Sequence, residues 1–126
     1  MNECELGDID GVKPILRPTR DEKMKVIELF MSQQKEKNLN LDKARALLTD
    51  LLYNSLFLWE DKKRTDKKEE GSEDITKDDI DDFVVAHIFE IWLEVLNAMD
   101  IVDKKKLEEL QKQQAEQAKE IQEDPN

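Results

Sequence analysis

The stretch "ILRPTRDEKMKVIEL", residues 15–29, is where the chain changes from an extended pattern to a helical one. Pro18 disfavours helical geometry at the residue before it, so a helix is expected to begin after this proline. Thr19 and Glu22 have the spacing of a capping box, in which each side chain accepts a backbone N–H of the other residue. Apolar residues then recur at helical spacing and predict a core-facing stripe, made of Val26 with Met24, Ile27, Phe30 and Met31.

Before this stretch the sequence predicts a short β ribbon. Asp10-Gly11 is a strong signal for a two-residue hairpin turn. Pairing across that turn would place Leu6 opposite Ile15. Pro14 cannot donate a backbone hydrogen bond, so the second strand is expected at a sheet edge. A two-stranded ribbon is marginal alone and is therefore expected to lie on the helices or on a partner.

After this stretch three more helices are expected. The second begins at the N-cap Asn40, and its apolar stripe runs through Ser55 and Leu56 and on to Leu58 and Trp59. It is the most apolar part of the chain and should form a central helix. The third helix follows Thr76, with Asp79 as a weaker capping partner, and its buried face comprises Ile80, Phe83, Val84, His87, Ile88, Ile91, Trp92, Val95 and Met99.

The remaining segments define the expected domain organisation. Residues 60–74 carry twelve charged side chains in fifteen positions and predict a charged loop or a solvated helix extension. Residues 1–102 would form one helical domain with an N-terminal β ribbon. Residues 103–126, with Asp103 as N-cap, would form a weakly amphipathic helix or tail. The predicted fold class is mainly α, with three to four helices and a short N-terminal β ribbon.

Composition limits the function classes. The chain has 126 residues, and 31 acidic against 20 basic side chains give a formal net charge of −11. This charge disfavours binding to nucleic-acid phosphates and to an anionic membrane surface. No run approaches the roughly 20 apolar residues that span a bilayer, and the N-terminus carries acids where a signal peptide carries basic residues. We therefore expect a cytoplasmic protein that binds neither nucleic acid nor membrane.

The sequence offers little for catalysis or metal binding. His87 is the only histidine and sits on an apolar helix face, which favours a satisfied, half-buried side chain. Cys4 is the only cysteine, and an inert thiol in a strand or tail is expected. The acidic runs at 7–11 and 78–82 lack the glycine and glutamate positions of a calcium-binding EF-hand loop. We expect no enzymatic activity, no metal and no cofactor.

The sequence from 12 to 30, "VKPILRPTRDEKMKVIELF", resembles the opening of the tail assembly chaperones of long-tailed bacteriophages. In those proteins a short strand ends in a junction of this type and a helix follows. The apolar helix after the charged gap, Ile80 to Met99, is similar in placement. The residues that carry the likeness are Leu16, Arg17, Pro18, Thr19, Asp21 and Glu22.

The resemblance implies a non-enzymatic chaperone in the host cytoplasm. Such proteins coat the tape-measure protein, keep its hydrophobic helices from aggregating and help recruit tail-tube subunits. A chaperone for apolar helices needs adaptable apolar surfaces and a charged exterior, and this sequence has both. The residues expected to form the protein-binding groove or the core, two roles that the sequence does not separate, are Met24, Ile27, Phe30, Met31, Leu52, Leu56 and Trp59.

Three alternatives remain open from the sequence. The first is a generic helical adaptor or a self-associating subunit, which includes a homo-oligomer. The second is an acidic mimic of nucleic acid that occupies a basic site on another protein, although the carboxylates are dispersed rather than regularly spaced. The third is an enzyme without a recognisable motif. A very long, helix-rich reading frame just downstream of the gene would favour the chaperone over the first alternative, and binding competition with DNA on a host factor would test the second.

Overall fold

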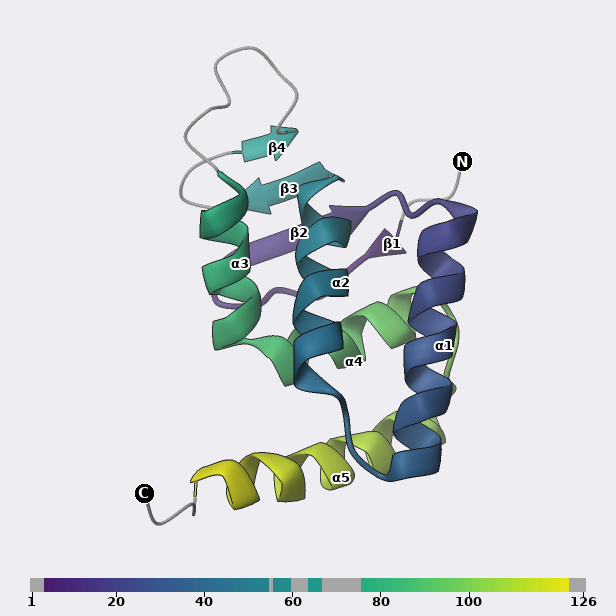
Figure 1. The fold of residues 1–126 in the computed structure, drawn as a ribbon. Coiled ribbons are helices and arrows are strands. Elements are labelled where there is room, and N and C mark those ends of the chain that lie inside the picture. The colour runs from purple at the N-terminus through teal and green to yellow at the C-terminus, as the bar shows by residue number, and fades with distance from the viewer. Residues whose placement is uncertain (1–3, 55, 60–63, 67–75, 123–126) are drawn as a thin grey trace.

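The computed structural model describes residues 4–54, 56–59, 64–66 and 76–122 (Figure 1). Its strands are β1 (Cys4–Glu5), β2 (Val12–Leu16), β3 (Leu56–Trp59) and β4 (Arg64–Asp66). Its helices are α1 (Arg20–Glu36), α2 (Leu41–Tyr53), α3 (Lys77–Ala86), α4 (Ile88–Ala98) and α5 (Lys104–Gln122). The predicted class, mainly α with an N-terminal β ribbon, is confirmed.

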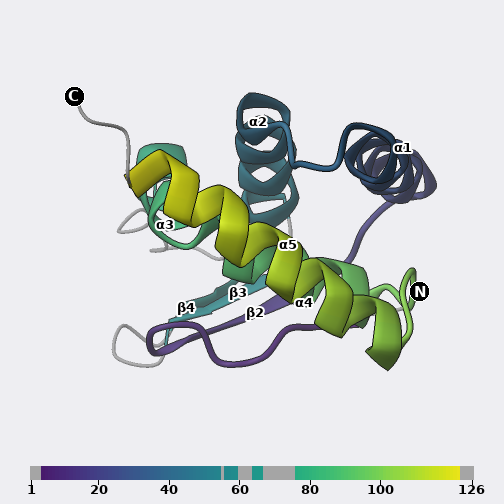
Figure 2. The same cartoon turned by 90° about the horizontal axis from the view of Figure 1, so that it is seen from below.

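Helix α2 lies between α3 and α1. In Figure 1, α3, α2 and α1 stand side by side, and the sheet lies behind the upper ends of α2 and α3. Seen from below, α5 crosses the end of the molecule in front of α4 (Figure 2). α2 packs against three helices, α1, α3 and α4, and against strands β2 and β3. The expectation that the second helix is central is therefore confirmed, although α4 is the more apolar of the two helices.

The N-terminal ribbon turns where the sequence predicts. Asp10 and Gly11 both have positive φ, 52° and 81°, as a two-residue type I′ hairpin turn requires. The register is shifted by one residue, because Glu5 rather than Leu6 lies opposite Ile15. Between β1 and the turn, Gly7 donates its N–H to the side chain of Glu94 on α4 at 2.9 Å.

Strand β2 is not an edge strand, so that prediction is wrong. It lies between β1 and β3 in a four-stranded sheet of order β1-β2-β3-β4, with Pro14 opposite Phe57. The N–H and C=O of one strand residue point to the same side, and the Pro14 carbonyl accepts from Leu6 N–H on the β1 side. The missing donor of Pro14 therefore faces β1, which ends at Glu5.

Helix α2 ends at Tyr53, so the predicted helical continuation through Leu56 to Trp59 is wrong. Residues 56–59 form β3, which pairs with β2 and also with β4. A short apolar run such as residues 56–59 is compatible with either a helix or a strand. Here it forms a strand because its backbone pairs with β2. Of the charged segment 60–74, Arg64–Asp66 form β4 and the other residues lie outside the described part of the chain.

The predicted helix starts are confirmed. Thr19 and Glu22 form a reciprocal capping box, with N···O distances of 2.9 and 3.1 Å. Thr76 and Asp79 form a second one at the start of α3. The side chains of Asn40 and Asp103 cap the other two predicted starts. These capping interactions span three residues, which is why the local sequence predicts them.

The predicted third helix is divided at His87 into α3 and α4. Its predicted face is nevertheless core, with His87 and Ile88 half-buried and the other predicted residues buried. α5 packs on α4 and inserts Leu110 into the core. On α5, Gln117 accepts the backbone N–H of Leu39 and donates to its carbonyl, both at 2.9 Å.

Candidate protein-binding surface

Helix α1 has two apolar faces, and only one is covered. Val26 and Leu29 are buried in the core together with Gln33. Met24 and Met31 lie on another face with 49% and 64% of their surface exposed. The prediction that Met24 and Met31 belong to a core-facing stripe is wrong, because α1 turns its Val26 face toward the core. Their line with Ile27, which is half-buried, is here named the α1 stripe: Met24, Ile27 and Met31.

The other predicted binding residues lie elsewhere. Phe30 is half-buried and packs against the core, beside the α1 stripe. Leu52 is a core residue of α2, with 1% of its surface exposed. Leu56 and Trp59 are in β3, and their side chains are outside the described part of the structure. The structure therefore aligns three of the seven predicted residues on one face of α1, where Met24 and Met31 are exposed and Ile27 is half-buried.

Charged side chains border the α1 stripe. At about 100° per residue, Arg20 and Lys35 fall in line with the stripe, one at each end of α1. Lys23 lies on one side of the stripe, and Asp21 and Glu28 lie on the other. All five are exposed. The apolar line is thus bounded by cations at both ends and by opposite charges on its two sides.

A cleft between α1 and α2 was not predicted. Its volume is about 360 Å³, at the lower end of ligand pockets. Each helix contributes residues at i, i+3, i+4 and i+7, which lie on one helix face. This spacing is the sequence pattern that could have predicted the cleft. Its apolar lining residues are Leu29, Ala46 and Leu47, and its charged or polar ones are Lys25, Glu28, Ser32, Lys43 and Asp50. Glu28 lies between this cleft and the α1 stripe.

A buried hydrogen bond fixes the covered face of α1. Trp92 on α4 donates its indole N–H to Gln33 Oε1 at 2.9 Å, and both side chains are buried. Gln33 Nε2 has no hydrogen-bond partner among the described residues. A buried amide is costly unless it is paired, so this bond favours one rotation of α1 about its axis. That rotation leaves Met24 and Met31 in solvent.

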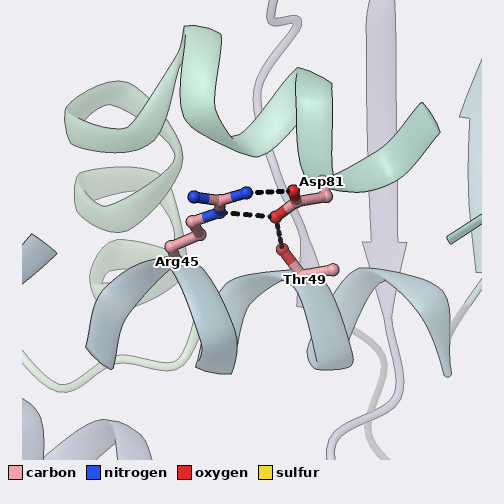
Figure 3. A network of polar contacts seen from close by, with 3 residues as sticks. All are labelled: Arg45, Thr49 and Asp81. Carbon is pink, nitrogen blue, oxygen red and sulfur yellow. Dashed lines mark hydrogen bonds and ion pairs between the residues drawn. The ribbon is translucent and has the colours of Figure 1, made fainter. Parts of the chain in front are cut away.

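An ion pair joins α2 to α3 near the surface (Figure 3). Arg45 donates to both carboxylate oxygens of Asp81, at 2.9 and 2.6 Å, and Thr49 donates to one of them at 3.2 Å. The hydrogen bond from Arg45 lowers the pKa of Asp81, and the same bond raises the pKa of Arg45. This network is a structural link between two helices. Arg45 and Asp81 are 36 positions apart, so the sequence pattern did not predict their pairing.

His87 and Cys4 occupy structural positions. His87 is half-buried at the α3–α4 junction, as expected, with Asp10 at 3.5 Å from Nε2 and Glu90 at 3.7 Å from Nδ1. Cys4 lies in β1 opposite Leu16. Burial raises the pKa of the Cys4 thiol, and Lys23 partly offsets this. A raised pKa reduces the reactive thiolate, in line with the expected inert thiol.

Within the part of the chain that the structure describes, no group of three or more His, Cys, Asp or Glu side chains is arranged to hold a metal ion. No helix among the same residues is long and apolar enough to cross a membrane. No protein-family model, no curated protein and no solved structure matches this chain.

Proposed function

We propose that this protein is a non-enzymatic chaperone that holds an apolar helical segment of a partner protein on the α1 stripe. The observation that carries the proposal is the exposure of Met24 and Met31 in line with Ile27. Large apolar side chains scattered singly on a surface are common, whereas exposed apolar side chains that gather in one patch indicate an interaction site. Of the three large apolar side chains that are exposed in the described residues, two belong to this line.

The chemistry of the stripe suits a helical client. Methionine side chains are flexible and polarizable, so they adapt to partners of different shape. A row at i, i+3 and i+7 packs along a second helix by inserting its side chains between those of the partner. The formal net charge of −11 would keep a complex with an apolar client in solution.

The identity of the client comes from the resemblance of the N-terminal junction to phage tail assembly chaperones. That resemblance proposes the tape-measure protein as client, the recruitment of tail-tube subunits as a later step, and the host cytoplasm as location. A generic helical adaptor or a self-associating subunit would use the same surface with another partner. The acidic-mimic alternative has less support, because Asp81 in the acidic run of α3 is paired with Arg45.

Co-expression tests the proposal. A helical segment of a phage tape-measure protein is produced with the natural chain, with Met24→Ser/Met31→Ser, and with Val85→Ser. Val85 is a matched control, since it is a large apolar residue on α3 with 50% of its surface exposed. The segment should be soluble with the natural chain and the control, and insoluble with the double variant. Equal solubility with and without the natural chain would contradict the chaperone function.

A further inference from the structure

The charge pattern at the α1 stripe differs from that of the whole protein. Arg20 and Lys35 lie at its two ends, and neither makes an ion pair with a described residue. Their separation of fifteen positions corresponds to roughly 22 Å along the helix axis. Between them the exposed line is apolar. A protein with a net charge of −11 thus presents a binding line with a cation at each end.

From this pattern we propose the chemistry of the partner segment. It is an amphipathic helix of another protein, with acidic side chains at both ends of its apolar face, roughly 22 Å apart. The inference rests on the proposed function and adds a recognition rule to it. Arg20 and Lys35 are the specificity-determining residues, and Met24, Ile27 and Met31 provide the apolar contact.

Because both ends of the α1 stripe carry a cation, the expected charge pattern of the partner is the same for a parallel and an antiparallel helix. A parallel or antiparallel partner meets a cation at each end of the stripe, so an acid at each end satisfies both orientations. A second copy of α1 does not satisfy this pattern. Antiparallel packing of two α1 helices with Met24 opposite Met31 would place Arg20 opposite Lys35, and these like charges repel. The rule therefore favours a different protein over self-association through this stripe.

The sides of the stripe influence only the position of the partner. Lys23 lies on one side, and Asp21 and Glu28 lie on the other. An acidic helix is therefore drawn toward the Lys23 side and away from the cleft between α1 and α2. This leaves the two end contacts in place.

The local rule and the net charge predict opposite preferences. Long-range attraction to an acidic protein favours basic peptides, whereas the end cations of the stripe favour acidic ones. At physiological ionic strength the screening length is about 8 Å, so charges in contact with the bound helix should dominate. Peptide charge is therefore a sharp test of whether the α1 stripe is the binding line.

The test uses two stapled helical peptides with Leu at the spacing of the α1 stripe. One carries Glu at each end, at the spacing of Arg20 and Lys35, and its twin carries Lys there. Affinities for the natural chain are measured by fluorescence anisotropy in 0.15 M salt, the condition for which the screening argument holds. The Glu-ended peptide should bind about tenfold more tightly, as expected for two surface ion pairs replaced by two like-charge contacts.

Variants identify the residues responsible. Arg20→Glu/Lys35→Glu should reverse the preference between the peptides, while Lys112→Glu/Lys119→Glu on α5, with the same change in net charge at two exposed positions, should preserve it. A Lys-ended peptide that binds the natural chain equally or more tightly overturns the rule and leaves the chaperone function standing. Failure of both peptides to bind also overturns the rule, and the co-expression result then decides the function separately.

Discussion

Helices α1 and α4 both carry apolar side chains on more than one face. In α4 all of these side chains are buried or half-buried, whereas in α1 Met24 and Met31 are exposed. α4 packs against α2, α3, α5 and β1, and its buried residues are Ile91, Trp92, Val95 and Leu96. α1 lies at one edge of the molecule with α2 as its main neighbour (Figures 1 and 2). Surplus apolar residues are therefore core in a surrounded helix and surface in a peripheral one.

The largest expected effect is in the covered helix. Trp92→Ala removes a fully buried ring and leaves Gln33 Oε1 without its donor. The free energy of unfolding should fall by about 3 to 5 kcal/mol, measured by urea denaturation. A loss below about 1 kcal/mol would show that Trp92 is not part of the packed core.

The next effect concerns the start of the peripheral helix. Thr19→Ala removes the side-chain oxygen that accepts Glu22 N–H at 3.1 Å. The expected cost is about 1 kcal/mol of unfolding free energy, since a lost N-cap has this size. Ser32→Ala, within α1, serves as the control and should not destabilise the protein, because alanine favours helix. Equal stability of the natural protein and Thr19→Ala would contradict the capping role.

Substitution of the exposed stripe should scarcely affect folding. Met24→Ser/Met31→Ser should lower the unfolding free energy by about 0.5 kcal/mol, because serine is the poorer helix former and no core contact is lost. Circular dichroism during urea titration measures this. A loss comparable to that of Trp92→Ala would mean that the stripe is covered, and the contrast between α1 and α4 would fail.

The smallest effect is expected at the surface ion pair between α2 and α3. The fold lowers the pKa of Asp81, so the unfolded chain binds its proton more readily. The stabilisation is present above the ordinary Asp pKa of about 3.9 and is lost as the pH falls through the lower folded value. Asp81→Asn should therefore melt slightly below the natural protein at neutral pH, and thermal scans should converge in acid. A difference that grows in acid would contradict this.

Local chemistry explains what the sequence predicted. The caps at Thr19, Asn40, Thr76 and Asp103 each join residues three apart, and the Asp10-Gly11 turn needs only two residues with positive φ. The strongly apolar face of the predicted third helix was also correct, because its period extends over several turns. Each of these features is determined within a short segment.

The wrong predictions depended on distant partners. Residues 56–59 became a strand because β2, more than forty positions earlier, pairs with them. The rotation of α1 depends on the Gln33–Trp92 bond, which joins residues 59 positions apart. Sequence periodicity identified Met24 and Met31 as apolar positions on a helix. It could not determine whether a neighbouring element covers them, so core and binding surface remained unresolved.

Methionine methyl NMR tests the central claim most directly. Two of the methionines, Met24 and Met31, lie on the exposed α1 stripe, whereas Met99 is in the core with 4% of its surface exposed. Their methyl signals therefore report separately on the stripe and on the core. When a helical peptide from the binding assay is titrated in, the Met24 and Met31 signals should shift and the Met99 signal should stay. Binding that leaves the Met24 and Met31 signals unchanged would contradict the proposal that the α1 stripe holds the partner helix.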